Sequence, residues 1–245
     1  MNRIEFLGIP IDNLTMAETL TTISGAIEQK RQLHHVVVNA GKVVAMQKDE
    51  QLKESVVNSN LINVDGQAVV WASRFLGTPL KERVAGIDLM ENLVMLSGRK
   101  GYKIFFLGAT EKIVKSVVNK YTKEHGEEII AGYRNGYFKN SEEQQIAEQI
   151  SKSGAQLLFV AISSPKKEKF LYQYREKLAN VNLIMGVGGS FDVVAGKMKR
   201  APLWMQKVGL EWFYRFVQEP KRMWKRYLVG NTKFILLVLK DRIKF

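Results

Sequence analysis

The feature that most constrains the fold is an alternation of short apolar runs with longer segments of helical period. Several of the short runs are apolar at consecutive positions, so both faces of such a strand would be buried, as in a parallel sheet. Strands that alternate with amphipathic helices predict an α/β fold, here a Rossmann-like, doubly wound, mainly parallel sheet. The expected strands are residues 34–39, 61–64, 103–108, 128–133, 156–162 and 181–188.

Local signals place some helix boundaries. Thr110 precedes a helical stripe and can cap it, and Ser141 with Gln144 three residues later resembles a capping box. Pro220 is expected to open a helix at its first turn. No strand-like run follows Gly196, so the chain is expected to divide into an α/β core, 1–195, and a C-terminal helical appendage, 196–245.

Composition excludes several classes of protein. The chain has no cysteine, which rules out a disulfide framework, a zinc ribbon and a thiol nucleophile. Its three histidines, two of them adjacent, argue against a histidine-built metal site. No apolar run is long enough to span a bilayer, and the N-terminus lacks the apolar segment of a signal peptide. These features predict a cytoplasmic protein.

Charge is concentrated in the appendage. Residues 197–245 contain 13 lysines and arginines against three acids, which accounts for +10 of the net charge of +13. Trp and Tyr are interleaved with these bases, a pattern typical of segments that lie on an anionic membrane surface. The same pattern suits single-stranded nucleic acid, and the apolar stripe could instead dock on the core. An exposed apolar stripe would also favour a homo-oligomer, a dimer or a trimer.

Small and polar residues follow five of the expected strands. In an open α/β sheet, ligands bind beyond the carboxyl ends of the strands, so these positions are expected to form one composite pocket. They are Asn39-Ala40-Gly41, Asp65-Gly66-Gln67, Gly108-Ala109-Thr110, the segment 163–168 that contains Lys167, and the segment 186–190.

Three glycines after the last strand, Gly186, Gly188 and Gly189, would let backbone N–H groups approach a phosphate. Their spacing matches neither a P-loop nor a G-x-G-x-x-G dinucleotide fingerprint. A tight turn that requires positive φ angles explains the glycines equally well.

Two carboxylates and one arginine are the candidates for chemistry. Asp65 could act as a general base, or could only form an Asx turn or a helix N-cap. Asp192 poses the same choice, with a nucleobase or ribose as its possible partner. No D-x-D occurs, so Arg or Lys would have to neutralise a nucleotide diphosphate. Arg83 is a candidate, although an ion pair with Glu82 or Asp88 would also explain it.

Several spaced blocks, in order, resemble the WecG/TagA/CpsF family of bacterial glycosyltransferases over almost the whole chain. They are LGIPID (7–12), VNAGKV (38–43), VDGQAVVWAS (64–73), ERVAGIDLM (82–90), FFLGAT (105–110), GYRNGYF (132–138), SPKKE (164–168), GVGGSFDVVAGKMKRAP (186–202) and GLEWFYRFVQEPKRMWKR (209–226).

The resemblance implies an inverting, metal-independent enzyme without a cofactor, which the missing D-x-D fits. Such an enzyme would move N-acetylmannosamine, its uronic acid or a related sugar from a UDP-sugar to a polyprenyl-diphosphate-linked sugar, such as undecaprenyl-diphosphate N-acetylglucosamine. It would work peripherally on the inner face of the cell membrane, in the synthesis of teichoic acid, capsule or exopolysaccharide. No nucleic acid would be a partner.

The resemblance also implies roles for single residues. Asp65 would be the catalytic base and Arg83 would support the diphosphate leaving group. Asn39, Gly66, Gln67 and Lys167 would line the substrate pocket. The nucleotide would lie near Gly108, Tyr137, Asp192 and the glycines Gly186, Gly188 and Gly189. From the appendage, Arg215, Arg222 and Arg226 would reach over the pocket.

The chain departs from the family's pattern at three positions of this pocket. A usual threonine is replaced in Val37-Val38-Asn39, a usual acidic residue is Lys42, and a usual glutamine is Lys167. A cation at residue 167 could pair with a uronate or a phosphate. These departures lie where the donor or acceptor sugar would sit, so they concern the identity of the sugars and not the reaction class.

A second hypothesis remains open on the residues alone. In it the chain is a basic α/β module that binds nucleic acid without catalysis. Binding would then be sensitive to salt and would not need the residues at the strand ends.

Overall fold

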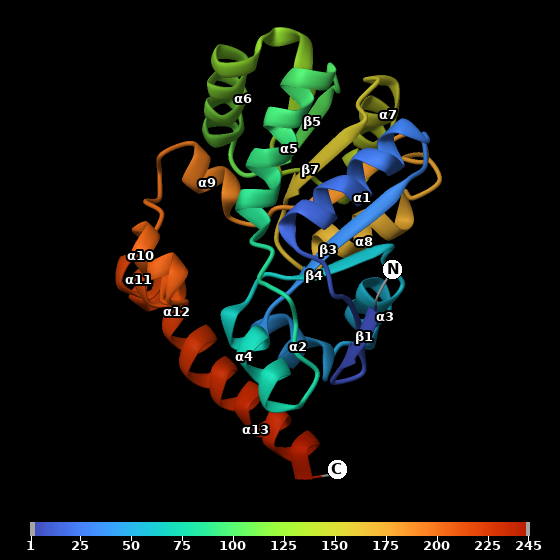
Figure 1. Cartoon of the computed structure of the whole chain (residues 1–245). Coiled ribbons are helices and arrows are strands. Elements are labelled where there is room, and N and C mark those ends of the chain that lie inside the picture. The colour runs from blue at the N-terminus through green and yellow to red at the C-terminus, as the bar shows by residue number, and fades with distance from the viewer. Residues whose placement is uncertain (1–2, 244–245) are drawn as a thin grey trace.

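The fold is built on a central parallel sheet (Figure 1). The computed structural model describes residues 3–243, and the side chains of Arg222, Lys225 and Arg226 lie outside the described part. All six expected strands are present, and every neighbouring pair is parallel. The strand order is β4-β3-β8-β7-β5-β6. The strands are β3 (Leu33–Val38), β4 (Leu61–Val64), β5 (Ile104–Gly108), β6 (Ile130–Arg134), β7 (Leu157–Ala161) and β8 (Leu183–Gly186).

Helices cover both faces of this sheet, which confirms the doubly wound α/β prediction. Neighbouring side chains on a strand point to opposite faces, so Phe105 packs in one apolar cluster and Phe106 in another. One face carries α1 (Met16–Glu28), α5 (Gly86–Lys100), α6 (Glu111–His125) and α9 (Ser190–Val194). The other carries α2 (Ala40–Met46), α3 (Glu50–Val57), α4 (Gln67–Phe75), α7 (Glu143–Lys152) and α8 (Lys166–Gln173).

A short antiparallel hairpin precedes the sheet, formed by β1 (Arg3–Phe6) and β2 (Ile9–Asp12). The Asp12 carboxylate accepts a hydrogen bond of 2.8 Å from the Ile62 N–H of β4 and pairs with Arg3. Because β4 is an edge strand, the hairpin satisfies a backbone donor that would otherwise stay unpaired inside the protein.

The helix boundaries test three local predictions. Thr110 caps α6, accepting from the Ile113 N–H, and Pro220 begins a helix, as expected. The capping box at Ser141 is wrong. Ser141 lies inside a 3₁₀ turn, η2 (Asn140–Glu142), and α7 begins after Glu142. The Glu142 carboxylate accepts the Lys139 N–H at 2.8 Å, so a carboxylate one residue later closes this turn instead of the hydroxyl.

The appendage is helical and packs back on the core. A 3₁₀ turn, η1 (Glu127–Ile129), lies in the core directly before β6. Beyond β8, the described residues contain no further strand. The appendage elements are α10 (Leu203–Lys207), α11 (Glu211–Gln218), α12 (Pro220–Trp224), the π-helical turn η3 (Lys225–Val229) and α13 (Gly230–Ile243).

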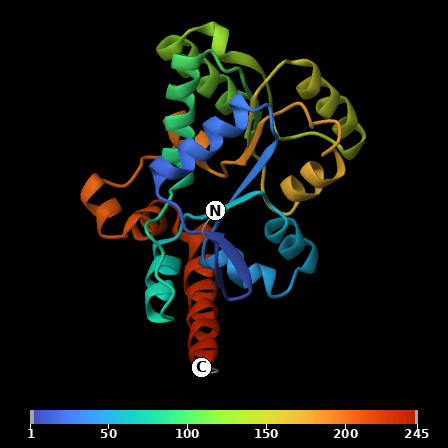
Figure 2. The ribbon, with the colours of Figure 1, turned by 45° about the vertical axis from the view of Figure 1, so that its right-hand side comes forward.

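Helix α13 runs along α2 and α4 at one end of the molecule (Figures 1 and 2). Phe234 and Val238 are buried there in the same cluster as Phe6, whose ring centroid lies 6.4 Å from that of Phe234. The last helix therefore belongs to an apolar core that includes the first strand. The division into units 1–195 and 196–245 stays a prediction.

Candidate active site

The site lies where the strand order reverses. The chain leaves β3 toward β4 on one side, whereas β8, which pairs with β3, connects back to β7 on the other. Such a reversal opens a crevice beyond the carboxyl ends of the two strands. A cavity of about 1680 Å³ occupies this position, and the appendage forms part of its wall.

Most of the predicted site residues line this single cavity. They are Asn39, Asp65, Gly66, Gln67, Arg83, Tyr137, Lys167, Gly186, Gly188, Gly189, Asp192 and Arg215. Gly108 is not among the lining residues, and the side chains of Arg222 and Arg226 fall outside the described part of the chain.

Asp65 follows β4 and stands in the cavity wall. Burial raises the pKa of its carboxyl to about 6, and the Arg83 guanidinium and a hydrogen bond from the Gly86 N–H oppose that rise. The N-cap of α4 is Gly66, which makes no side-chain cap bond, so Asp65 does not cap this helix. A carboxylate with a pKa close to neutrality can accept a proton during a reaction.

Arg83 is held beside Asp65 by a residue of the appendage. Its Nη1 lies 3.0 Å from the Glu211 Oε2 at the start of α11. Glu211 also lies 3.5 Å from the Arg200 Nε, through its other carboxylate oxygen. Arg200 in turn forms a two-point contact with Asp88 of α5, one bond of which measures 2.7 Å. We call Arg83, Glu211, Arg200 and Asp88 the ion-pair network.

The ion-pair network shows which carboxylate pairs with Arg83. Neither Glu82 nor Asp88 is its partner. The Glu82 carboxylate accepts the Met16 N–H, and Asp88 is engaged by Arg200. The sequence could not suggest Glu211, because it lies 128 positions from Arg83.

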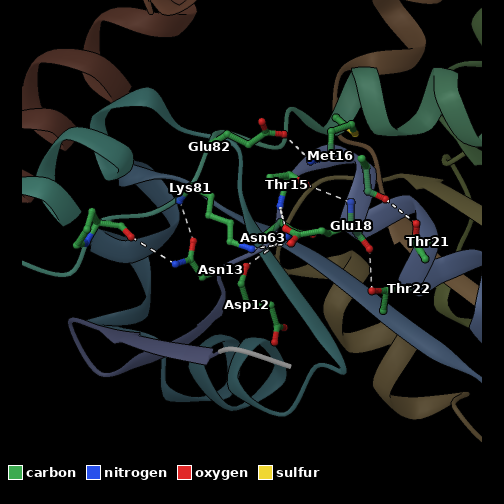
Figure 3. Close-up of polar contacts among 12 residues, drawn as sticks. Asp12, Asn13, Thr15, Met16, Glu18, Thr21, Thr22, Asn63, Lys81 and Glu82 are labelled. Carbon is green, nitrogen blue, oxygen red and sulfur yellow. Dashed lines mark hydrogen bonds and ion pairs between the residues drawn. The ribbon is translucent and has the colours of Figure 1, made fainter.

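The segment in front of Arg83 is fixed by the N-terminal region (Figure 3). Asn13 accepts the Lys81 N–H at 2.8 Å and donates to the Pro79 carbonyl. The Lys81 ammonium lies 2.6 Å from the Glu18 carboxylate at the start of α1. Arg83 therefore lines the cavity from a loop that is tied to the N-terminal region by hydrogen bonds and an ion pair.

The glycine turn after β8 lies against two cations. A Cβ at Gly186 would approach the Lys167 Nζ to 2.9 Å, and one at Gly189 would approach the Arg215 Nη2 to 2.5 Å. Gly188 has a φ of +53°. The glycines therefore serve both a tight turn, at Gly188, and the close approach of two cations, at Gly186 and Gly189. Because these residues have no side chains, the backbone of the turn is open to the cavity.

Arg215 is the appendage residue at this turn. Its Nε is buried and has no hydrogen-bond partner among the described residues. A buried guanidinium N–H without an acceptor is costly, and the Nη2 of the same side chain faces Gly189 in the glycine turn.

Lys167 and Lys42, two of the departures from the family's pattern, meet at one carboxylate. The Glu168 Oε1 lies 3.2 Å from the Lys167 Nζ and 3.9 Å from the Lys42 Nζ. Burial acts to raise the pKa of Glu168, but the two ammonium groups and a backbone hydrogen bond together hold it below its usual value. The pKa of His34 is lowered to about 4, mainly by burial and in addition by the same two ammonium groups.

The remaining predicted residues divide into two groups. Asn39 caps α2 by accepting the Lys42 N–H at 3.0 Å, and a Cβ at Gly66 would lie 3.1 Å from the Asn39 Cβ, so both also shape the strand ends. Asp192 pairs with Lys197 at 3.1 Å, while Tyr137 is exposed at the rim.

Gly108 has a structural role. Its φ is +132°, and a Cβ there would meet the Ala161 backbone at 2.5 Å. The glycine allows β5 and β7 to end in close contact, beside the cavity but outside its lining.

Residues 3–243 contain no cluster of three His, Asp or Glu side chains arranged to hold a metal ion. Within the same residues, every helix is too short or too polar to cross a bilayer.

Sequence reasoning missed two of the charged residues in the site, Glu211 and Arg200. Both stand inside blocks that carry the family resemblance, the blocks 209–226 and 186–202. That position in the blocks was the available signal, but nothing in the blocks says that the two residues meet.

The chain matches known proteins along almost its whole length. Residues 4–245 match the model of the glycosyl transferase WecG/TagA/CpsF family. The chain is 38% identical, over 88% of its length and 82% of the relative's, to the N-acetylglucosaminyldiphosphoundecaprenol N-acetyl-beta-D-mannosaminyltransferase of Bacillus subtilis strain 168. A protein of the same name from Bacillus spizizenii is 36% identical over 76% of this chain and 71% of its own. The chain thus belongs to the WecG/TagA/CpsF family of glycosyl transferases.

Proposed function

We propose that the protein transfers N-acetylmannosamine, or a closely related sugar, from a UDP-sugar to undecaprenyl-diphosphate-linked N-acetylglucosamine in the synthesis of a cell-envelope polymer. The relatives' names support the acceptor and the class of sugar. The observation that carries the proposal is the position of Asp65. It lies with a raised pKa in the wall of the one cavity that also receives Arg83, the glycine turn and Arg215.

The proposed reaction is a single displacement. The acceptor hydroxyl attacks the anomeric carbon from the face opposite UDP, and the bond from that carbon to the UDP oxygen breaks. Asp65 takes the hydroxyl proton as the new glycosidic bond forms. The configuration at the anomeric carbon inverts, and UDP leaves with the bonding electrons.

Charge on the leaving diphosphate would be stabilised by cations already in place. Arg83 stands near the base, and Arg215 and Lys167 lie against the glycine turn. Arginine binds phosphate oxygens at two points, and fixed cations need no rearrangement as charge develops. Asp192 and Tyr137 would hold the uridine at the rim.

We further propose that the appendage rests on the inner face of an anionic membrane. Leu203, Trp204 and Val208 are exposed on and after α10, next to Lys207. Apolar and aromatic side chains enter the interface while basic groups meet the headgroups, at about 1 kcal/mol for each base near the surface. This location would bring the enzyme to an acceptor that cannot leave the lipid.

The test is transfer to a water-soluble acceptor. The protein is incubated with a panel of UDP-sugars and a short-chain prenyl-diphosphate N-acetylglucosamine, and products are read by mass spectrometry. We expect a product larger by one N-acetylhexosamine with one donor. Asp65→Asn keeps the shape of the side chain but removes the base, so its kcat should fall by roughly 100-fold or more while UDP still binds.

Turnover of Asp65→Asn at the wild-type rate would refute the role of the base. Failure of every UDP-sugar, together with salt-sensitive binding of single-stranded nucleic acid, would instead favour the binding-module hypothesis.

A further inference from the structure

The cavity continues beyond the charged site into an apolar groove between α4 and α13. Its walls are Trp71 and Phe75 on α4, and Ile235 and Leu239 on α13. Each pair is spaced by four residues, so its two members share one face of their helix. All four side chains are between 44% and 56% exposed, which leaves them free to contact another molecule.

The floor of this α4–α13 groove is part of the protein core. Phe234 and Val238 of α13 and Ala72 of α4 line the cavity, yet each is at most 8% exposed. They belong to the cluster that holds Phe6 and the strands β3 and β4. The groove is therefore a fixed surface with a packed backing.

The groove begins at the proposed catalytic base. Helix α4 starts at Gln67, two residues after Asp65, and Gln67 lies against Gly209 in front of α11. From Gln67 to Phe75 the helix advances by about 12 Å, at 1.5 Å for each residue. A molecule lying along α4 would thus have one end near Asp65 and the other near Phe75.

We propose that the α4–α13 groove binds the first isoprene units of the acceptor's polyprenyl chain, an inference that rests on the proposed function. The acceptor is amphipathic, since its sugar and diphosphate carry the charge and its tail carries none. The head must reach Asp65, so the tail must leave the cavity along some path. The groove starts at Asp65 and offers a path lined by large apolar side chains, on which an isoprenoid chain is removed from water.

A lipid surface fits this groove less well than a single chain. The floor is recessed between two helices, whereas a bilayer takes up projecting side chains. Other exposed apolar residues of the appendage are not in the cavity lining and suit the bilayer better, namely Leu203, Trp204, Val208, Leu236 and Ile243.

The experiment compares two neighbouring residues of α13 and two acceptors. Ile235 is 56% exposed in the groove, while Leu236 is 60% exposed outside it, so Ile235→Ser and Leu236→Ser remove similar surface from one helix. Each variant is assayed in solution, without membranes, using prenyl- and farnesyl-diphosphate N-acetylglucosamine.

We expect Ile235→Ser to raise the KM of the farnesyl acceptor about tenfold, equivalent to about 1.4 kcal/mol of lost binding, and to leave the prenyl acceptor unchanged. Leu236→Ser should change neither. Equal effects of Ile235→Ser on both acceptors, or an equal effect of Leu236→Ser on the farnesyl acceptor, would overturn the groove and favour a general apolar surface.

Calorimetric binding to Asp65→Asn separates this inference from the proposed function. If farnesyl acceptor binds more tightly than prenyl acceptor and the Ile235→Ser change abolishes that difference, the groove stands even if no sugar is transferred. If transfer occurs but neither binding nor KM depends on chain length, the proposed function stands and the groove is wrong.

Discussion

At the scale of residues, the site contains several charged side chains, and burial disfavours the charged form of one of them, Asp65. Asp65 is kept where burial disfavours its ionised form, although the proposed chemistry needs that form. Carboxylates with strongly shifted pKa values cluster at functional positions, although structural contacts also shift pKa values elsewhere. The network of Arg83, Glu211, Arg200 and Asp88 surrounds the carboxylate with charges of both signs.

The raised pKa of Asp65 predicts a pH-dependent penalty on stability. Its pKa in the fold, about 6, exceeds the ordinary value of 3.8, so the folded state binds the proton more tightly than the unfolded state. The protonated carboxyl therefore favours the folded state: its contribution to stability is complete below pH 4 and is lost as the pH rises through 6. At higher pH, keeping the ionised carboxylate buried costs stability. Asp65→Asn should therefore melt higher than the wild type at pH 7, and the difference should vanish near pH 4. A melting-temperature gap that does not change with pH would contradict the raised pKa.

Glu211 is expected to tune the base from the appendage. Its charge raises the pKa of Asp65, as does that of Asp88, while Arg83 and the Gly86 N–H lower it. Glu211→Gln should shift the acidic limb of the kcat/KM profile to lower pH, whereas a loss of appendage docking alone would lower kcat/KM at every pH. Asp241→Asn removes an appendage acid outside the network and should leave the limb in place.

At the scale of elements, glycines let strand ends and helices meet at the cavity. Gly108 brings the end of β5 against Ala161, and Gly209 brings the turn before α11 against Gln67 and Trp71. The second contact places Glu211 where it reaches Arg83. The charged site thus depends indirectly on the close approach of the turn before α11 to α4, which only a glycine at residue 209 allows.

Gly108→Ala tests the structural role of this glycine. The new Cβ would meet backbone that cannot yield, and its φ of +132° is unfavourable for alanine, so we expect a loss of about 2–4 kcal/mol in the free energy of unfolding. Gly154→Ala is the matched control: it has a φ of +72° but nothing within 4 Å, and should cost about 1 kcal/mol. Denaturant titration measures both. Equal losses would show that backbone strain alone matters at Gly108.

At the scale of the whole molecule, the appendage contributes to three parts of the proposed function. It supplies Glu211 and Arg215 to the cavity, one wall of the α4–α13 groove, and exposed apolar and basic side chains for a membrane surface. Its last helix is also packed into the core, where Phe234 meets Phe6. Any movement of the appendage that frees α13 would therefore expose core residues.

Truncation after Gly196 should remove most activity and most membrane binding. The shortened protein loses Glu211 and Arg215, and it exposes the surface that Phe234 and Val238 cover, so its melting temperature should also fall. Sedimentation with anionic vesicles measures the binding, and transfer to a short-chain acceptor measures the activity. If the truncated protein pelleted with vesicles as well as the full chain, the appendage would not be the membrane contact.

The amino-acid sequence by itself determined the α/β class, the six strands and the helical character of the appendage. Runs such as 104–108 and 157–161 are apolar on both faces, and only a strand covered by helices on both sides buries them. It also placed most of the pocket, because parallel strands bring the residues after them to one edge. The position of Asp65 and of the turn 186–189 in this pocket could be predicted from the sequence alone.

Only the tertiary structure decided what those residues touch. Arg83 and Glu211 are 128 positions apart, and no local pattern relates them. The N-terminal hairpin and α13 meet through Phe6 and Phe234 at opposite ends of the chain. Strand and helix periodicity is a property of neighbouring residues, whereas an ion pair, a groove between helices or a pKa depends on distances that exist only once the whole chain is packed.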